Sequence, residues 1–260
     1  GTLRSEWFEC ACCPPNLARL LPSLPGYVYA TKGNDVYVNL FIQSEAKINL
    51  DNGSIAIRQK TEYPWDGKVI LELNPDTELR SNLFIRIPGW ALKEAVPGDL
   101  YEFINTKKSK VKMLVNGTSV NYGMKDGYAV VNRNWKKGDK ISFTLDMPIE
   151  KVTANPKVEA NKNRVALQRG PIVFCAESAD YDDKNVFNIV IDKDSKLRTE
   201  FRGDLLNGVM VIKGDAKYAL ADKDGKRSLM KKKFTAVPYY AWNNRGMGQM
   251  IVWFAADAQT

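Results

Sequence analysis

The sequence predicts an all-β protein made of two antiparallel β-sandwich domains that follow one short helix. Short runs of β-branched and aromatic residues recur after residue 26, and turn sequences such as Asn-Gly, Asp-Gly and Lys-Gly separate them. Helical periodicity is confined to one stretch near the N-terminus. A chain of 260 residues is long enough for two such domains.

The predicted helix lies before residue 25. Leucine occupies positions 17, 20, 21 and 24, which is the spacing of one helical face. Pro14 and Pro15 give a rigid entry to the helix, and we expect Pro22 and Pro25 to end it.

Two sets of strands follow the helix. We expect the first domain to span residues 26–148, with strands at 35–42, 54–59, 68–73, 82–87 and 112–117 and two more within 128–145. We expect the second domain to span residues 149–248, with strands within 157–177, 185–191, 208–214 and 232–242. The apolar run at about 249–256 is expected to extend the second sandwich or to return to the first.

Composition indicates a globular protein and argues against nucleic-acid binding. Apolar residues make up 44% and charged residues 26% of the chain. The net charge is +8, but the lysines do not form one basic patch: we expect solvated turns at 107–110, 136–137 and 231–233. We therefore expect no nucleic-acid partner.

No run reaches the length of a membrane span, and the N-terminus has no signal-peptide pattern. The sequence does not distinguish between the bacterial cytoplasm and the periplasm. Because the chain opens on Gly-Thr-Leu-Arg without a methionine, we expect it to be a processed or excised piece of a longer protein.

Three of the four cysteines, Cys10, Cys12 and Cys13, lie just before the predicted helix. They allow three interpretations: a strained disulfide within the cluster, a thiolate site for zinc, or buried free thiols that act as small apolar side chains. The chain has no histidine and no second cysteine pair to complete a zinc site. Cys175 stands alone in a strand-like stretch and is expected in the core.

The segment "CACCPPNLARLLPSLPGYVYA" resembles the cysteine-pair motif of glycoside hydrolase family 127, the bacterial β-L-arabinofuranosidases. The segments "NRVALQRGPIVFCAE" and "VPYYAWNNRGMGQMIVWF" are also similar to that family, as are "KTEYPWDGKVILEL", "LFIRIPGWA" and "LVNG". The resemblance covers nearly the whole chain.

The resemblance implies a zinc- and cysteine-dependent retaining hydrolase. In that family one Glu and three Cys hold zinc, and the first cysteine of the adjacent pair is the nucleophile. Cys12 then corresponds to the nucleophile and a zinc ligand, and Cys13 to a second zinc ligand. Cys10 does not correspond to the third cysteine ligand, and the two glutamates of the family have no counterpart in this chain.

The resemblance also implies a missing partner. Residues 1–25 correspond to the end of an α/α barrel, the catalytic domain, and the rest to β-sandwiches behind it. We expect the chain alone to be inactive, with the barrel and a carbohydrate substrate as its partners and a homodimer as a further expectation.

The alternative function is a carbohydrate-binding or assembly (dimerisation) module without catalysis. Sugar rings stack on exposed aromatic side chains. The candidates for such a surface are Trp65, Trp90, Trp135, Trp242 and Tyr239, for which core or turn packing is the competing role. A third interpretation makes the sandwiches a support for the barrel. We expect the turn containing Asn243–Gly246 to close the fold, with contact to the barrel as its alternative.

Overall fold

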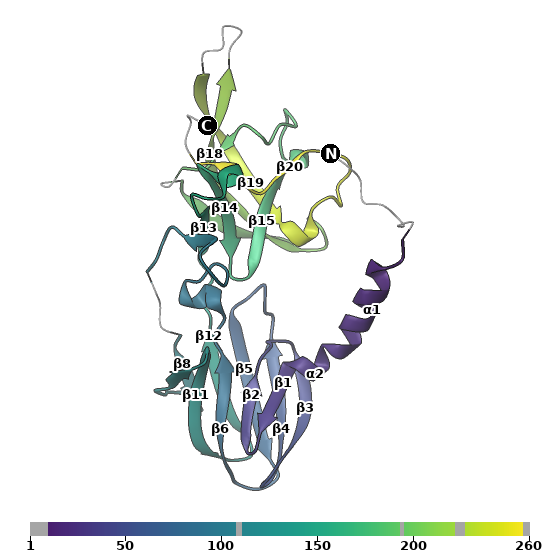
Figure 1. The fold of residues 1–260 in the computed structure, drawn as a ribbon, viewed down its shortest axis with the longest axis vertical. Coiled ribbons are helices and arrows are strands. Elements are labelled where there is room, and N and C mark those ends of the chain that lie inside the picture. Colours follow the sequence, from purple (N-terminus) through teal and green to yellow (C-terminus); the bar gives the residue numbers. More distant parts are fainter. Residues whose placement is uncertain (1–9, 108–110, 193–194, 222–226, 257–260) are drawn as a thin grey trace. The chain divides into compact units, whose positions relative to one another are not determined.

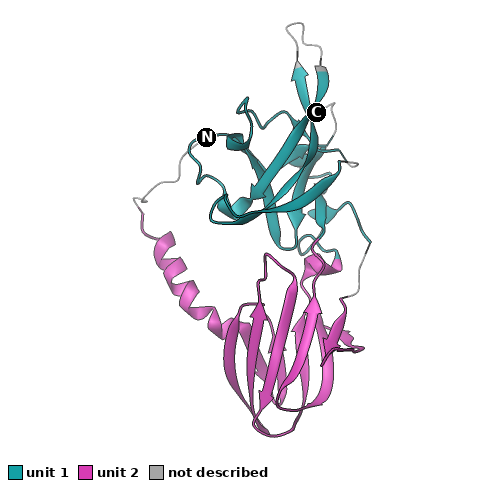
Figure 2. Ribbon diagram, turned by 180° about the vertical axis from the view of Figure 1, so that it is seen from behind, with its two compact units in different colours: residues 1–6, 93–107, 148–260 teal, residues 7–92, 108–147 magenta. Residues whose placement is uncertain are grey.

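A computed structural model describes residues 10–107, 111–192, 195–221 and 227–256 of the chain. Within these ranges the residues form two compact units (Figure 2). Unit 2 contains residues up to 92 together with those of 108–147, and unit 1 contains residues 93–107 together with those from 148 onward. Strands dominate both units (Figure 1), so the prediction of an all-β protein with a short N-terminal helix is confirmed.

The N-terminal helix is longer than its leucines predict. Helix α1 (Cys13–Ser23) is followed directly by α2 (Pro25–Val28), and Leu24 between them keeps helical backbone angles. Pro22 lies inside α1, so the prediction that it ends the helix is wrong. Pro25 stands at the start of α2, where a proline needs no backbone N–H donor.

Unit 2 is built from two sheets that enclose one core. The first has the order β1 (Tyr29–Lys32), β2 (Asp35–Val38), β6 (Leu79–Arg86), β11 (Tyr128–Trp135), β10 (Gly123–Lys125). The second has the order β3 (Ser44–Leu50), β4 (Gly53–Thr61), β5 (Lys68–Pro75), β12 (Asp139–Thr144), β8 (Met113–Val115), β9 (Thr118–Ser119). The short helix η1 (Gly89–Leu92) follows β6. All these pairings are antiparallel except β2 with β6.

Alternation of side chains decides which face of each strand enters the core of unit 2. Val69, Leu71 and Leu73 of β5 are fully buried, and the residues between them are more exposed. The indole of Trp135 is buried beside them and donates to the carbonyl of Ser81 at 3.2 Å. A period of two with apolar residues inward is what a half-buried strand requires.

Unit 1 has one continuous set of paired strands. The order is β20 (Met250–Ile251), β15 (Ile172–Glu177), β19 (Arg227–Pro238), β18 (Val209–Ala221), β16 (Ile189–Val190), β21 (Phe254–Ala255), β14 (Arg164–Arg169), β13 (Ile149–Ala154), β7 (Tyr101–Phe103). Strand β17 (Leu197–Arg202) also pairs with β18. The short helices are η2 (Glu159–Asn161), η3 (Ser178–Asp180) and η4 (Tyr239–Ala241). Because β14 also pairs with β15, the pairing closes into a circuit around the core.

The C-terminal strands belong to unit 1. Strand β20 pairs with β15, and β21 pairs with β14 and, in parallel, with β16. The sequence allowed residues 249–256 either to extend the second domain or to return to the first. In the structure they extend the second.

Residues 93–107 were expected in the first domain, residues 26–148, but the structure places them in unit 1. They lie between β6 and β8, yet β7 pairs with β13 of unit 1. Asn155 donates to the carbonyl of Asp99 at 3.1 Å, and Lys93 forms a nearly buried ion pair with Glu150. Backbone pairing and charge together hold this segment on unit 1.

Lys231, Lys232 and Lys233 lie in strand β19, so the prediction of a turn there is wrong. The partner strand β18 supplies Asp215 for Lys233, and Asp183 pairs with Lys232. Lys108 and Lys110 lie outside the described residues. No described helix has both the length and the apolar character needed to cross a membrane.

Candidate functional site

The cysteine pair lies at the start of helix α1. Cys13 is the first residue of the helix and Cys12 is the residue before it, with Pro14 and Pro15 in the first turn. The two Sγ atoms are 3.6 Å apart, and both cysteines are free and exposed. Cys10 is also free and exposed, so no disulfide forms among the three, and the interpretation of buried apolar thiols does not fit them either.

Polar contacts of the first turn hold the backbone at Cys12. The Asn16 amide donates to the Cys12 carbonyl at 2.9 Å, and Arg19 donates to the Asn16 side chain at 3.3 Å. The helix N-terminus carries unpaired backbone N–H groups and the positive end of the helix dipole, which favour a thiolate or another anion there. The segment therefore presents two adjacent thiols that can act as nucleophile or as metal ligands.

The spacing of the two sulfurs suits a shared zinc ion. Zinc–sulfur bonds of about 2.3 Å in a tetrahedron place two thiolates about 3.8 Å apart, close to the observed 3.6 Å. Among the described residues no third Cys, His, Asp or Glu joins them to form a metal-binding group. Cys12 and Cys13 thus fit half of a tetrahedral zinc site, and Cys10 is not brought to it.

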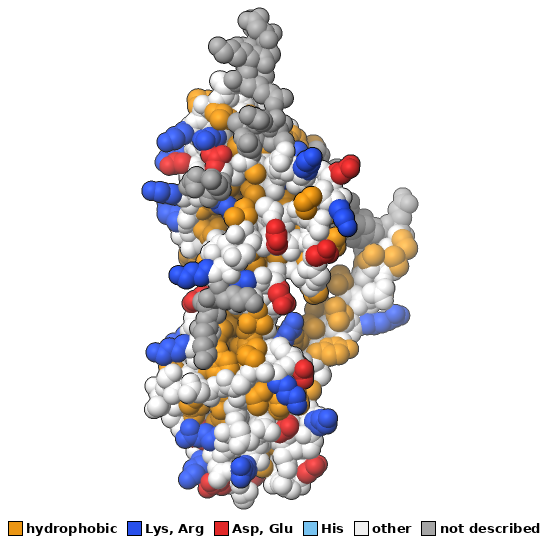
Figure 3. Space-filling view, turned by 60° about the vertical axis from the view of Figure 1, so that its left-hand side comes forward, with side chains coloured by type: hydrophobic (Ala, Val, Ile, Leu, Met, Phe, Trp, Pro, Cys, Tyr) orange, Lys and Arg blue, Asp and Glu red, His pale blue; other side chains and the backbone are white. Residues whose placement is uncertain are grey.

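Helix α1 also carries an uncovered leucine face. Leu17 and Leu21 are 59% and 63% exposed and Leu20 is 49% exposed, and no residue of α1 is buried. Figure 3 shows hydrophobic side chains along this helix. An isolated helix of this length is only marginally stable in water, so this face indicates a packing partner.

The fourth cysteine is a core residue, as predicted. Cys175 of β15 is completely buried and packs against Val209, Val211 and Val237. Burial, with a smaller effect from Glu177, raises the pKa of its thiol to about 12. Cys175 therefore stays protonated and is no candidate nucleophile.

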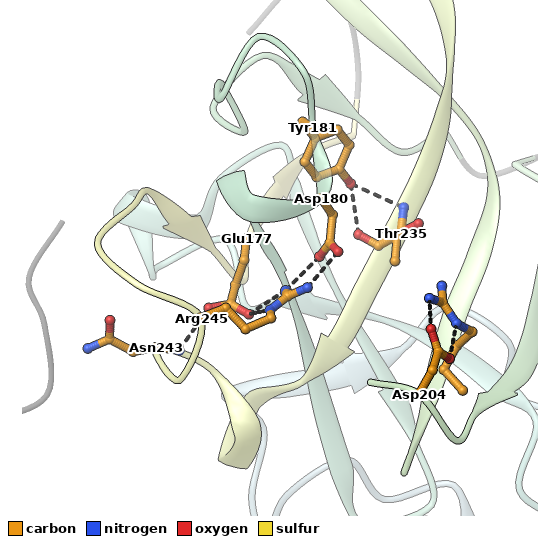
Figure 4. A network of polar contacts seen from close by, with 8 residues as sticks. Glu177, Asp180, Tyr181, Asp204, Thr235, Asn243 and Arg245 are labelled. Atoms are coloured by element: carbon orange, nitrogen blue, oxygen red, sulfur yellow. Dashed lines mark hydrogen bonds and ion pairs between the residues drawn. The ribbon is translucent and has the colours of Figure 1, made fainter. Parts of the chain in front are cut away.

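A second polar cluster lies at the end of β15 (Figure 4). The Arg245 guanidinium donates to both carboxylate oxygens of Asp180 at 2.6 and 2.7 Å, and to Glu177 Oε2 at 2.5 and 3.0 Å. The other oxygen of Glu177 accepts the backbone N–H of Asn243 at 2.7 Å. Burial disfavours the charged guanidinium, but its hydrogen bonds to the Asp180 and Glu177 carboxylates outweigh burial, and the pKa of Arg245 is raised.

This arrangement serves structure rather than proton transfer. Both carboxylates are nearly buried and are occupied by Arg245, so neither offers a free oxygen pair to a substrate. The turn at Asn243–Gly246 closes the fold in this way. Its partners Glu177 and Asp180 were missed from the sequence. Their spacing of three residues at the end of a buried strand is the signal that could have pointed to them.

The aromatic candidates differ in exposure. Trp135 is a core residue, and Trp90 and Trp242 are partly buried. Trp65 is 52% exposed and Tyr239 is 45% exposed, and the Tyr239 ring stacks on Trp242 with centroids 6.1 Å apart. Trp65 is thus the most exposed of the five candidates.

Two family models match the chain. Residues 35–147 match the middle domain of glycoside hydrolase family 127, described as β-L-arabinofuranosidase, and residues 149–255 match the C-terminal domain of the same family. The two models meet between β12 and β13.

Curated and solved proteins agree with the models. A non-reducing end β-L-arabinofuranosidase from Bifidobacterium longum is 30% identical over 96% of this chain and 37% of its own length. A solved family 127 β-arabinofuranosidase is 41% identical with a TM-score of 0.92, covering 99% of this chain and 40% of that one. A family 127 β-L-arabinofuranosidase from Geobacillus stearothermophilus T6 is 37% identical with a TM-score of 0.86, covering 99% and 39%.

The chain spans about 40% of the length of these relatives. Their likeness extends over both units, and both matching models describe domains of one family. The chain therefore belongs to glycoside hydrolase family 127, of which it carries the middle and C-terminal domains.

Proposed function

We propose that this chain is the C-terminal part of a retaining, zinc- and cysteine-dependent glycoside hydrolase that acts on β-L-arabinofuranosyl or related linkages. The observation that carries the proposal is the pair of exposed thiols at the start of α1, with sulfurs 3.6 Å apart. The printed activities of the relatives, β-L-arabinofuranosidases, support the substrate class.

In this proposal the remainder of the protein is an α/α barrel that covers the leucine face of α1. Leu17, Leu20 and Leu21 would lose their exposed area in a helix-to-helix contact, at about 25 cal/mol per Å² of apolar surface. The same contact would bring Cys12 and Cys13 to carboxylates of the barrel. Relatives that are about 2.5 times as long leave room for such a domain.

The proposed reaction uses Cys12 as nucleophile. Its Sγ attacks the anomeric carbon, the glycosidic C–O bond breaks, and a barrel carboxylic acid donates its proton to the leaving oxygen. Water then displaces the sulfur and gives its proton to the same carboxylate, which restores both groups and retains the anomeric configuration. Zinc held by Cys12 and Cys13, when bound, would keep Cys12 deprotonated.

A hybrid enzyme tests the proposal. It joins the part of the 41%-identical relative that this chain does not cover to the N-terminus of this chain. We expect the hybrid to release L-arabinose from an aryl β-L-arabinofuranoside with retention and the 260-residue chain to release none. Cys12→Ser should lower kcat by several orders of magnitude, because the reaction loses its nucleophile.

Matched controls separate the two roles of the thiols. Cys10→Ser, which changes an exposed cysteine outside the pair, should keep full activity. Cys13→Ser should lower the zinc content measured by elemental analysis as well as the activity. Undiminished activity in Cys12→Ser, or arabinose release by the chain alone, would overturn the proposal. Homodimer formation also stays a prediction, which light scattering on the hybrid would test.

A further inference from the structure

Three thiols lie within four residues at the start of helix α1. Cys10, Cys12 and Cys13 are all free and exposed, whereas Cys175 is buried. The proposed mechanism uses Cys12 and Cys13 and gives no role to Cys10. Small oxidants reach exposed thiols far more readily than buried ones. The three thiols are therefore open to oxidation, and the local backbone decides which two sulfurs can join.

The backbone disfavours a disulfide between Cys12 and Cys13. Disulfide-bonded residues have Cα atoms about 4.4–6.8 Å apart, whereas the Cα atoms of adjacent residues are only about 3.8 Å apart. Cys12 has helical backbone angles, φ −63° and ψ −36°, and Cys13 begins the helix. Closing so small a ring would distort the first turn, so this pair stays as two thiols.

Cys10 and Cys13 have the spacing that suits a disulfide. Ala11 and Cys12 form a turn between them. In a helical turn, residues three apart are neighbours with Cβ atoms about 5–6 Å apart, whereas residues two apart do not face each other. A disulfide needs Cβ atoms about 3.5–4.5 Å apart, so a movement of about 1–2 Å closes the bond. Residues 10–13 thus form a Cys-x-x-Cys sequence at a helix start, an arrangement typical of thiol–disulfide exchange.

The closing movement falls on Cys10 because the residues after it are anchored. The Asn16 amide donates to the Cys12 carbonyl at 2.9 Å. Pro14 and Pro15 fix the backbone φ angles of the first turn of α1. Cys13 therefore keeps its place, and the segment before the turn approaches it.

We propose that Cys10 is a resolving thiol, which joins Cys13 in a reversible disulfide when the protein meets a small disulfide oxidant. One of the two thiols attacks a sulfur of the oxidant, which gives a mixed disulfide and releases one small thiol. The other thiol then attacks the mixed disulfide, forms the Cys10–Cys13 bond and releases the second small thiol. Two protein thiols are oxidised, one small disulfide is reduced, and the protons of the protein thiols pass to the two products.

The consequence for catalysis rests on the proposed function. Cys13 cannot serve as a zinc ligand while its sulfur is in the disulfide, so the oxidised enzyme loses one of its paired thiols. The bond is exposed, and it pulls on the first turn of α1, and exposed or strained disulfides are the labile, regulatory kind. Reduction would restore the pair, so Cys10 makes the site reversibly sensitive to the redox state.

Differential labelling of the 260-residue chain tests the bond. The chain is equilibrated with oxidised and reduced glutathione, its free thiols are blocked with a light alkylating reagent, and it is then reduced and labelled with a heavy one. Trypsin cleaves after Arg4 and Arg19 and leaves all three thiols in one peptide, residues 5–19. We expect the heavy label on Cys10 and Cys13 and the light label on Cys12.

The number of reactive thiols in the native chain should fall from three to one on oxidation. The internal bond should prevail over mixed disulfides with glutathione, because the second thiol is tethered beside the first. Heavy label on Cys12, no heavy label at any glutathione ratio, or an oxidised chain that consists of disulfide-linked dimers would overturn the proposal.

Matched single substitutions identify the two partners. Cys12→Ser changes only the thiol between them, so the internal disulfide should still form. Cys10→Ser removes the resolving thiol, so oxidation should stop at a mixed disulfide that carries glutathione. An internal disulfide in Cys10→Ser, or its loss in Cys12→Ser, would show that Cys12 and not Cys10 is the partner of Cys13.

The hybrid enzyme separates this inference from the proposed function. Oxidised glutathione should lower its zinc content and its activity, and dithiothreitol with added zinc should restore both. The Cys10→Ser hybrid, fully active in reducing buffer, should keep several-fold more activity at the same glutathione ratio. An active hybrid that forms no Cys10–Cys13 bond overturns the inference alone. An inactive hybrid combined with this bond in the chain overturns the proposed function and supports the resolving role of Cys10.

Discussion

At the scale of single residues, burial divides four chemically identical thiols into two kinds. Cys10, Cys12 and Cys13 are exposed, whereas Cys175 has no exposed surface. A thiol reagent should therefore label three cysteines in the native chain and the fourth only in denaturant, because a buried protonated thiol does not react.

Cys175 also predicts how stability depends on pH. Burial raises the pKa of its thiol from about 9 to about 12. Above pH 9 the unfolded chain therefore loses a proton that the folded chain keeps, so this contribution to stability falls as the pH rises from about 9 to 12. The loss is of the order of a few kcal/mol at the upper limit. Tyr181, whose pKa burial also raises to about 12, acts in the same direction.

The free energy of unfolding is measured at pH 8 and at pH 10.5. Hydrogen exchange of peptides from unit 1 then shows whether the change lies in that unit. Cys175→Ala should make the loss of stability between pH 8 and pH 10.5 smaller. The share of the loss that is due to Tyr181 should remain. An equal decrease in the variant and the parent would show that Cys175 does not contribute.

At the scale of elements, Arg245 ties the loop before β20 to the end of β15. Further contacts support the same junction. The Ser178 N–H donates to the Gln249 carbonyl, the Gln249 N–H donates to the Ser178 hydroxyl, and β15 pairs with β20. A Cβ atom at Gly248 would come within 2.2 Å of the Ser178 hydroxyl, so a larger residue there would displace this hydroxyl from its bond with the Gln249 N–H. The side-chain cluster and the close backbone contact thus define one junction.

Arg245→Met should destabilise unit 1 by about 3–5 kcal/mol, because it leaves two nearly buried carboxylates without their cation. Arg245→Lys should recover only part of this loss, since an ammonium cannot reproduce the two forked contacts. Hydrogen exchange of β15 and β20 measures the effect. Arg202→Met, which breaks the more exposed pair with Asp204, is the control and should have little effect on stability.

Local pattern predicted most strands, and long-range pairing explains the exceptions. Strands β4, β5 and β11 have apolar residues at a period of two and were found from the sequence. Strand β3 was missed because its exposed positions are polar and the residues between them are only partly buried. The lysines of β19 look like a turn until β18 supplies their partners.

The same limit applies to the candidate site. Cys12 and Cys13 are recognisable because their motif is local, and the chemistry of adjacent thiols needs no other segment. The Arg245 cluster joins residues 65 and 68 positions apart in the sequence, so it has no local signature. Residues that depend on tertiary pairing are therefore those the sequence does not reveal.

At the scale of the whole molecule, residues 93–107 belong to unit 1 although unit 2 precedes and follows them in the sequence. They precede the last strands of unit 2 but complete the edge of unit 1 through β7 and β13. The nearly buried Lys93–Glu150 ion pair belongs to the same attachment, and the Lys93 ammonium lies 5.8 Å from the ring centre of Phe103. A cut at residue 148 would therefore not yield a complete unit 1.

Lys93→Met should lower the stability of unit 1 by about 3–5 kcal/mol and leave unit 2 unchanged, although residue 93 directly follows unit 2 in the sequence. Faster hydrogen exchange in β7 and β13, with unaltered exchange in β4 and β5, would be the expected pattern. Lys136→Met is the control because its pair with Glu78 is largely exposed. Loss of protection in unit 2 would contradict the assignment of this segment.

The position of β7 also has a consequence for synthesis on the ribosome. Strand β7 is translated about 46 residues before β13, the strand to which it pairs. At about 5–20 residues per second, several seconds pass in which the remaining strands of unit 2 are made while β7 has no partner. The nascent chain must therefore keep this edge segment from pairing wrongly until unit 1 begins to emerge.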